Sequence, residues 1–162
     1  MTTAIYPGSF DPITNGHLDV LKTSSEIFDK VIIAVAYNSQ KEGNGLLNVK
    51  ERVELIKKCI IDFKNVEVDS FEGLTVEYAK EKNAKVLIRG LRAVSDFEYE
   101  MQLSQTNSAL NKEIKTIFLT TRPKYNFISS SSVKEIVSLK GDVSKFVPSA
   151  VDEYLKTKFY LG

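Results

Sequence analysis

The only histidine of the chain, His17, stands at the end of a loop rich in proline and glycine. An apolar run at residues 4–6 precedes this loop, and apolar side chains follow it at helical spacing, namely Leu18, Leu21 and Phe28. The pattern places His17 where a first strand feeds a first helix. Glycine allows a backbone to approach a phosphate closely, the free N–H groups of a helix start attract anions, and an imidazole can add a hydrogen bond or a positive charge. Residues 8–17 therefore predict a nucleotide-phosphate site, against the alternative of a turn that binds nothing.

A second group of chemically active side chains follows another apolar run, at residues 86–88. There Arg89 and Arg92 flank Gly90 and Leu91, at the predicted carboxyl end of a strand. Guanidinium groups match phosphate oxygens in a bidentate way. The segment is a candidate phosphate site, and a solvated basic turn is its alternative.

Four consecutive serines, residues 129–132, follow Tyr125, Asn126, Phe127 and Ile128. A helix cap needs only one serine. Four of them offer hydroxyl and backbone N–H donors at a helix start, which suits the terminal phosphates of a nucleotide. A polar loop that merely caps a helix accounts for the same residues equally well.

Composition limits the classes of protein to consider. The 162 residues suit one domain spanning residues 1–162, and the formal net charge of +1 gives no general electrostatic case for nucleic acid or membrane surfaces as partners. The single cysteine, Cys59, cannot form an intramolecular disulfide, and with one histidine it cannot build a His/Cys zinc site, so we interpret it as a core residue. The chain shows no basic, apolar leader and no apolar run of membrane-spanning length, so the cytoplasm is the expected location.

Two frequent motifs of nucleotide-binding proteins and hydrolases are missing from the sequence. It contains no Gly-x-x-x-x-Gly-Lys-Ser/Thr loop, and no nucleophile elbow surrounds the serines. Lys41 and Glu100, each taken alone, indicate only surface charge.

Strand-like and helical patterns alternate along the chain. Strands are predicted at residues 4–6, 31–37, 66–68, 86–88 and 116–119. Helices are predicted after His17, at residues 48–59 with Asn48 as the cap and Glu51 completing a capping box, at residues 75–81 and 96–111, from Ser132 onward, and at residues 151–159. Strands separated mainly by helices imply an α/β fold, a single-domain Rossmann-like parallel five-stranded sheet with helices on both faces. Ligands of such sheets bind outside the carboxyl ends of the strands, where the three groups of side chains are expected to meet.

Together these residues resemble the nucleotidyltransferase superfamily whose signature is His/Thr-x-Gly-His, here Thr14-Asn15-Gly16-His17. The chain is similar, more closely, to the bacterial phosphopantetheine adenylyltransferases. Three blocks carry this resemblance in the right order: Tyr6–His17, Leu87–Glu100 and Phe127–Ser131. The resemblance implies transfer of the adenylyl group of ATP to 4′-phosphopantetheine, giving dephospho-coenzyme A and pyrophosphate in the penultimate step of coenzyme A biosynthesis, with Mg²⁺ accompanying ATP.

The resemblance also implies a role for individual residues, with His17 as the catalytic residue that acts on the transition state. The ATP-binding residues would be Ser9, Phe10, His17, Gly90, Leu91, Arg92, Glu100, Tyr125, Asn126, Phe127, Ile128, Ser129, Ser130 and Ser131. The residues that bind 4′-phosphopantetheine would be Ser9, Lys41, Thr75 and Arg89. The family further implies a homohexamer built as two trimers and coenzyme A as a feedback ligand. We expect no protein ligand to a metal and, from the composition, neither nucleic acid nor membrane as a partner.

The chemistry of this reaction agrees with the residue types. A substrate phosphate would attack the α-phosphorus of ATP, and because that nucleophile is already ionised, His17 is expected to act electrostatically and neither as a base nor as a nucleophile. Two alternatives are transfer to another phosphate, such as nicotinamide mononucleotide or glycerol phosphate, and a regulator that binds a nucleotide or coenzyme A without turnover. The segment 89–100 argues against the first alternative, and the intact signature with both arginines argues against the second.

Overall fold

Five parallel strands form one sheet in the computed structural model, which describes residues 1–160 apart from the side chains of residues 94 and 95. Their order across the sheet is β3-β2-β1-β4-β5, and their bounds are β1 (Thr3–Gly8), β2 (Lys30–Tyr37), β3 (Val66–Glu72), β4 (Val86–Leu91) and β5 (Lys115–Thr120). The central strand is β1, and the chain first builds the sheet outward to β3 and then returns to build the other half. Such a reversal of direction opens a crevice at the carboxyl ends of the central strands.

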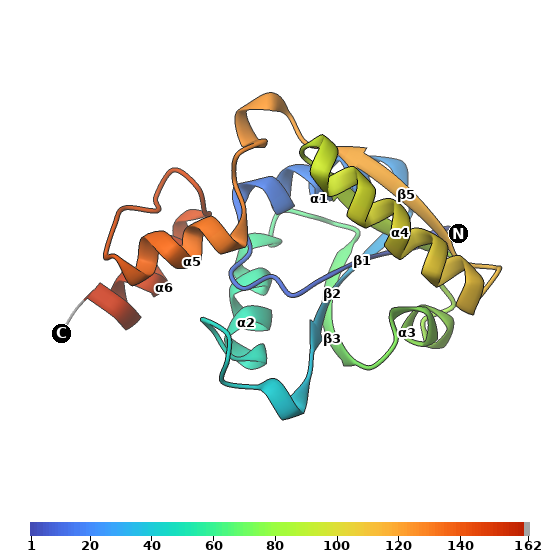
Figure 1. Ribbon diagram of the computed structural model, residues 1–162, viewed down its shortest axis with the longest axis horizontal. Helices are drawn as coiled ribbons and strands as arrows, with labels where there is room; N and C mark the ends of the chain where they lie inside the picture. Colours follow the sequence, from blue (N-terminus) through green and yellow to red (C-terminus); the bar gives the residue numbers. More distant parts are fainter. Residues whose placement is uncertain (161–162) are drawn as a thin grey trace.

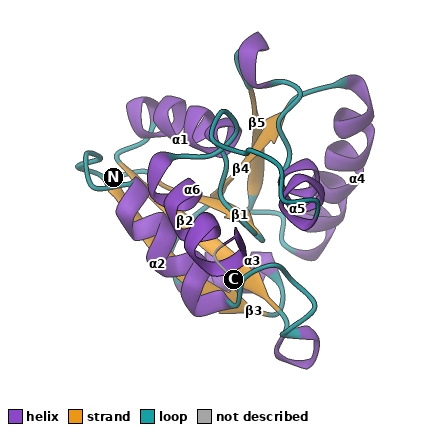
Figure 2. Ribbon diagram, turned by 90° about the vertical axis from the view of Figure 1, so that its left-hand side faces the viewer, coloured by secondary structure: helices purple, strands orange, loops and turns teal. Residues whose placement is uncertain are grey.

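Helices cover both faces of this sheet, as the sequence predicted. Their bounds are α1 (Asn15–Ile27), α2 (Val49–Cys59), α3 (Thr75–Glu81), α4 (Val94–Leu110), α5 (Ser130–Ser138) and α6 (Ser149–Leu155), with shorter helical turns η1 (Ser39–Lys41), η2 (Pro123–Tyr125) and η3 (Lys156–Tyr160). In Figure 2 the strands run through the middle of the molecule, with α1 and α2 on one side and α4 on the other. Figure 1 shows α5 and α6 at the end of the molecule that lies away from α3 and α4.

Two apolar clusters, one on each face, explain why the strand sequences are almost continuously hydrophobic. Along β1, Ala4 and Tyr6 belong to the cluster shared with α1, α2, α5 and α6, whereas Ile5 between them belongs to the cluster shared with α3. Successive residues of a strand point to opposite faces, so a strand covered on both sides needs apolar residues at every position. The α/β fold class and the parallel five-stranded sheet are confirmed.

Several predicted boundaries are corrected by the structure. The fourth strand does not end at Ile88, because Arg89, Gly90 and Leu91 pair with Phe118 and its two successors in β5. These residues therefore lie in the strand itself and not in the loop that follows it. The third strand is also longer than predicted, since its pairing with β2 continues to Glu72.

The helix expected from Ser132 begins two residues earlier, at Ser130. The Ser129 Oγ atom accepts a hydrogen bond from the Ser132 backbone N–H at 3.0 Å, so Ser129 is the cap. By contrast, α2 has the capping box that the sequence predicted, with Asn48 Oδ1 accepting from the Glu51 N–H at 2.8 Å and Glu51 Oε1 accepting from the Asn48 N–H at 3.2 Å.

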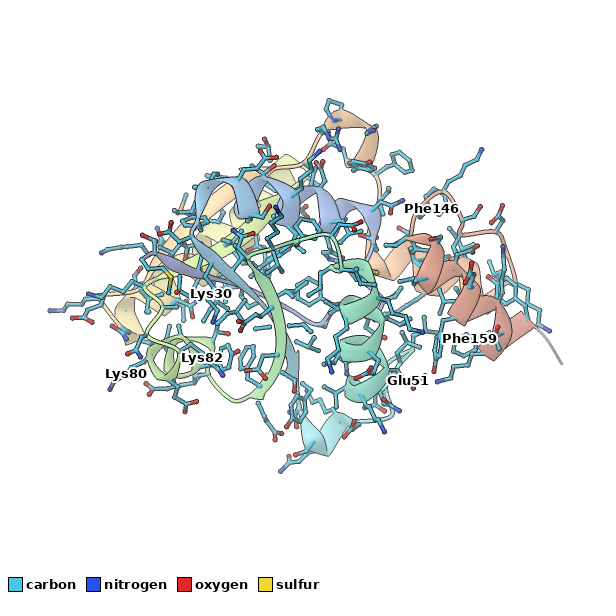
Figure 3. All side chains as sticks on the ribbon, turned by 180° about the vertical axis from the view of Figure 1, so that it is seen from behind. Lys30, Glu51, Lys80, Lys82, Phe146 and Phe159 are labelled. Carbon is cyan, nitrogen blue, oxygen red and sulfur yellow. The ribbon has the colours of Figure 1, made fainter. Side chains whose placement is uncertain are left out.

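The carboxyl-terminal segment packs against α2 through the same glutamate. The predicted last helix, residues 151–159, is regular α-helix only to Leu155, and η3 continues it with a wider winding. Glu51, labelled in Figure 3 beside Phe159, accepts hydrogen bonds from the hydroxyl of Tyr154 and, at 2.6 Å, from Nζ of Lys158. One carboxylate thus caps α2 and anchors the end of the described chain.

Cys59, the last residue of α2, is half-buried and packs against the core on the α1 and α2 face. Burial raises the pKa of its thiol to about 11. A thiol that stays protonated at neutral pH is a poor nucleophile, which agrees with the interpretation of Cys59 as a core residue.

Candidate active site

A cavity of about 330 Å³ opens where the sheet reverses direction, between the carboxyl ends of β1 and β4. The ends of β1 and β4, the loop after β1, the starts of α1, α4 and α5, and Thr121 after β5 form its walls. Eleven residues that the sequence proposed for the site line it: Ser9, Phe10, His17, Arg89, Gly90, Arg92, Glu100, Ile128, Ser129, Ser130 and Ser131. Three blocks that are far apart in the sequence therefore meet in one cavity.

His17 is the third residue of α1, and its ring completes the cap of that helix. The Thr14 backbone N–H donates to His17 Nδ1 at 3.0 Å, while the His17 backbone N–H donates to Thr14 Oγ1 at 3.4 Å. Because Nδ1 accepts a hydrogen bond, the neutral ring carries its proton on Nε2. The signature Thr14-Asn15-Gly16-His17 thus sets the tautomer of the histidine as well as its position.

Two aromatic rings lie close to the imidazole. The centroid of the Phe10 ring lies 5.0 Å from that of His17 in an edge-to-face arrangement, and the centroid of the buried Tyr6 ring lies 6.4 Å from it. Burial, followed by the positive charges of Arg92 and Arg89, lowers the pKa of His17 to about 3. The sequence left open whether His17 supplies a hydrogen bond or a charge. The structure favours a neutral ring that donates from Nε2.

This lowered pKa makes the stability of the fold depend on pH through His17. The unfolded chain protonates the ring near pH 6.5 and the folded chain only near pH 3, so between these values the unfolded state binds more protons and stability falls as the pH falls. The His17→Gln variant lacks this titration. Between about pH 7.5 and about pH 5, the unmodified chain should lose about 1–2 kcal/mol more unfolding free energy than the variant. Urea unfolding followed by circular dichroism measures the difference, and equal losses in the two proteins would contradict the assignment of a neutral ring.

Arg89 is held rigidly at the cavity wall by its neighbours. Its Nε and Nη2 atoms donate to the two carboxylate oxygens of Glu100 at 2.6 and 2.7 Å, and Nη1 donates to the Pro7 carbonyl at 2.9 Å. Burial disfavours its charge, but the hydrogen bonds and the charge of Glu100 more than offset this and raise the pKa of Arg89. Glu100, which the resemblance associates with ATP, acts in this structure as the partner that orients Arg89.

Arg92 joins the second block to the third. Its Nη1 atom donates to the Ile128 carbonyl at 2.8 Å, and its Nε and Nη2 atoms donate to the Asp96 carboxylate at 3.0 and 3.4 Å. The guanidinium therefore bridges the start of α4 and the loop before α5. Gly90, two residues earlier, allows α1 to pass close by, because a Cβ atom there would lie 2.9 Å from Val20 Cγ2.

The serine run has structural bonds as well as exposed donors. Ser129 caps α5, and the Ser130 hydroxyl donates to the Pro12 carbonyl at 2.9 Å, which ties α5 to the loop after β1. Ser131 completes the cavity wall. The amino ends of α1 and α5 both border the cavity, and their free N–H groups and partial positive charges favour an anion.

Six of the proposed site residues lie outside this cavity wall. Leu91 lies at the end of β4, and Tyr125, Asn126 and Phe127 precede the serines; Asn126 Oδ1 accepts a hydrogen bond at 2.8 Å from Thr121, which lines the cavity. Lys41 and Thr75 are the remaining two.

Lys41 and Thr75 lie after β2 and β3, in the other half of the sheet. Lys41 ends η1 in an exposed loop, and Thr75 begins α3. Glu72, at the end of β3, accepts hydrogen bonds from the Ser39 N–H at 2.6 Å and the Ser39 hydroxyl at 2.7 Å, which holds η1 beside β3. The residues proposed to bind 4′-phosphopantetheine thus extend from the cavity across the carboxyl edge of β2 and β3.

Sequence reasoning missed several residues that line the cavity or support it. Asp96 could have been found from the sequence, because it follows Arg92 by four residues, the spacing at which side chains on a helix can pair. Tyr6 carries no such signal, because an aromatic residue in a strand is normally a core residue. Asp11 and Arg52 are buried charges whose partners become visible only in three dimensions.

Among residues 1–160, no helix is long and apolar enough to cross a membrane.

Comparison with known proteins gives a consistent result. The family model of the cytidylyltransferase-like proteins matches residues 5–136. A phosphopantetheine adenylyltransferase of Alkaliphilus metalliredigens is 52% identical over 158 residues, which cover 98% of this chain and 99% of that protein. The phosphopantetheine adenylyltransferases of Caldanaerobacter subterraneus and Clostridium perfringens are 54% and 46% identical, each over 98% of this chain.

A solved structure from Vibrio parahaemolyticus, described as that of a candidate nicotinate-nucleotide adenylyltransferase, superimposes with a TM-score of 0.69. It covers 96% of this chain and 99% of its own, with 20% sequence identity. At that identity the likeness concerns the fold alone.

Proposed function

The chain belongs to the phosphopantetheine adenylyltransferase family, within the cytidylyltransferase-like proteins, and from that membership we propose how its residues divide the work of the reaction. The protein is an enzyme that transfers the adenylyl group of ATP to 4′-phosphopantetheine, giving dephospho-coenzyme A and pyrophosphate. We propose that residues 1–162 form one nucleotidyltransferase domain. The observation that supports the division of roles best is the convergence of His17, Arg92 and the start of α5 on one cavity.

In this proposal, His17 is the catalytic residue. The reaction brings two anions together and moves charge onto the α-phosphate of the transferring adenylyl group and onto the departing pyrophosphate. His17 donates a hydrogen bond from Nε2 to the transferring group, where negative charge is held in the transition state, and its fixed tautomer removes the need to reorganise the ring. The acceptor phosphate is already ionised, so the site needs no general base.

In this proposal, the ATP phosphates lie between the loop after β1 and the amino end of α5 and contact Ser9, Phe10, Arg92, and Ser129 to Ser131. All of these residues line the cavity. The nucleoside is held by Gly90, Leu91, and Tyr125 to Ile128. Glu100 borders this ATP site, and both of its carboxylate oxygens accept from Arg89. On the acceptor side, 4′-phosphopantetheine extends from Ser9 and Arg89 toward Lys41 and Thr75, along the carboxyl edge of β2 and β3.

Mg²⁺ enters this proposal as part of the substrate, bound to the phosphates of ATP. Asp96 and Glu100, whose carboxylates line the cavity, are each held by a guanidinium group. Mg²⁺ commonly keeps several water ligands and is bound through substrate phosphates. Within residues 1–160, no cluster of three or more His, Cys, Asp or Glu side chains could hold a metal ion. The divalent ion offsets phosphate charge, and Arg92 and the helix starts orient the resulting complex.

One incubation tests the activity. The purified protein, ATP, Mg²⁺ and 4′-phosphopantetheine should yield dephospho-coenzyme A and pyrophosphate in equal amounts, measured by chromatography and a coupled phosphate assay. Parallel tubes with nicotinamide mononucleotide or glycerol phosphate as the acceptor should yield neither product. Product formation with one of those acceptors alone would reassign the substrate, and binding of ATP without turnover would indicate a regulator.

We also propose a cytoplasmic homohexamer, built as two trimers, with coenzyme A as a feedback ligand. Exposed apolar side chains support association: Phe97 and Leu110 on α4 and Ile117 on the edge strand β5 are 42%, 54% and 36% exposed. Light scattering at micromolar concentration should give six times the 18.2 kDa of one chain. A monomer mass under the same conditions would contradict the hexamer.

A further inference from the structure

Two buried charged residues outside the proposed machinery connect the acceptor loop, residues 38–48, to the loop after β1. Asp11 is 3% exposed and Arg52 is 9% exposed. Asp11 stands directly after Phe10, and Arg52 lies in the first turn of α2. Removing a charged group from water is costly unless it gains strong partners, so their contacts indicate what each of them holds.

The Asp11 carboxylate clamps the end of the acceptor loop. Its Oδ2 atom accepts from the Leu46 N–H and its Oδ1 atom from the Leu47 N–H, each at 2.8 Å, and Lys134 Nζ of α5 lies 3.3 Å from Oδ2. The loop approaches so closely that a Cβ atom on Gly45 would lie 2.6 Å from Oδ2. The position of the acceptor loop is therefore set directly against the residue that follows Phe10.

Arg52 closes the same link from the other side. Its Nε atom donates to the Leu47 carbonyl at 3.2 Å, and its Nη1 atom donates to the Ser9 carbonyl at 2.9 Å. The Leu47 residue is thus bound at its N–H by Asp11 and at its carbonyl by Arg52. In a trans peptide the N–H points opposite to the carbonyl, so by holding the Ser9 carbonyl Arg52 also fixes the direction of the Phe10 N–H.

We infer that Asp11 and Arg52 are positioning residues that couple the acceptor loop to Ser9 and Phe10, and so set the phosphate-binding loop against His17. The inference rests on the proposed function, because it assigns the two loops to the acceptor and to the phosphates. Phe10 is the connecting element, since its ring packs on the His17 imidazole and its chain neighbour Asp11 receives the acceptor loop. A change in the position of the acceptor loop should therefore also change the alignment of the reacting groups at His17.

The variant Asp11→Asn tests this coupling at the carboxylate. It keeps the size of the side chain but replaces one acceptor oxygen by a donor, so one of the two N–H contacts is lost. We expect kcat to fall about 10–100-fold, because small misplacements of reacting groups have effects of that size. The KM for 4′-phosphopantetheine should rise, whereas ATP affinity measured by calorimetry should stay within about threefold, since most proposed ATP contacts lie in other segments.

Gly45→Ala tests the same contact from the acceptor loop and leaves the buried charges in place. Gly45 is exposed and its φ is not in the left-handed region, so the added methyl group acts through its collision with Asp11. Like Asp11→Asn, it should lower kcat and leave the affinity for ATP nearly unchanged. The kcat of the double variant should be little lower than that of Asp11→Asn alone. Both changes break the same contact between Asp11 and the acceptor loop, so their effects are not additive.

The matched control is Asp152→Asn on α6. Asp152 is also a buried aspartate, and its Oδ2 atom lies 2.8 Å from Nζ of Lys156. This variant should lower the midpoint of thermal unfolding and leave kcat unchanged. The inference is overturned if Asp11→Asn and Gly45→Ala fold and both keep kcat within about twofold, or if their effects multiply in the double variant. If Asp11→Asn does not fold, Gly45→Ala alone decides. Absence of dephospho-coenzyme A from the unmodified enzyme would instead refute the proposed function.

Discussion

His17→Ala is expected to slow the single-turnover transfer of the adenylyl group by about 10²–10³ while leaving the affinity for ATP nearly intact. The reason lies in the capping box of α1. Because Thr14 donates its backbone N–H to Nδ1, the neutral ring places its remaining proton on Nε2, which serves as a donor fixed in advance. A donor aimed at charge that grows during the reaction stabilises the transition state more than bound ATP.

Two controls separate this catalytic loss from a structural one. The ring also accepts a hydrogen bond from the backbone of the cap residue, so its removal should cost about 1 kcal/mol of stability, which thermal unfolding will show. Thr14→Ser keeps both the backbone donor and a hydroxyl, and it should retain most of the turnover. Rapid-quench measurement of the chemical step, paired with calorimetry of ATP binding, makes the test. Normal turnover in His17→Ala, or a folded variant that no longer binds ATP, would remove His17 from this role.

Apolar patterning predicted the sheet well because β1 and β2 are covered on both faces and therefore read as hydrophobic runs. The ends of two elements, β4 and α5, are predicted wrongly because apolar patterning does not mark them. The extension of β4 through Arg89 and Gly90 is held by backbone pairing with β5, which a charged residue and a glycine do not reveal. The sequence predicts the start of α5 two residues too late, because any of four consecutive serines could supply the capping oxygen, and only the fold selects Ser129.

The candidate site shows the same division between local and tertiary information. That His17 and Arg92 line the cavity could be predicted, because their neighbours in sequence mark a strand end and a helix start. The partners that orient the site could not. Asp11 meets Leu47 across 36 positions of the chain, and Arg89 meets Glu100 across 11 positions, so both contacts depend on how strands and helices are stacked. Residue types indicate which groups can bind phosphate, but only the fold shows which carboxylates hold those groups in place.

Arg89→Ala is expected to weaken the use of 4′-phosphopantetheine far more than the binding of ATP. Loss of a charge-assisted contact to a phosphate costs about 1.5–3 kcal/mol, which is roughly a 10–150-fold rise in the KM for the acceptor. The structure adds a second effect. Glu100 has a side chain only 9% exposed and would lose its partner, and breaking such a buried pair costs about 3–5 kcal/mol of folding stability.

The loss of acceptor binding and the loss of stability can be measured separately. The first comes from the missing contact to the acceptor phosphate, and the second comes from the unpaired carboxylate of Glu100. In Arg89→Gln/Glu100→Gln the buried negative charge is removed together with its partner, so much of the lost stability should return while the acceptor KM stays raised. Lys41→Ala offers a comparison on the same substrate, since Lys41 is exposed and should raise the acceptor KM without lowering the unfolding midpoint. Steady-state kinetics in both substrates and thermal unfolding give the readouts. If the double variant regains normal acceptor use, or if Arg89→Ala impairs ATP binding and spares the acceptor, the cation of Arg89 does not bind the acceptor phosphate and serves only to hold α4 against β1.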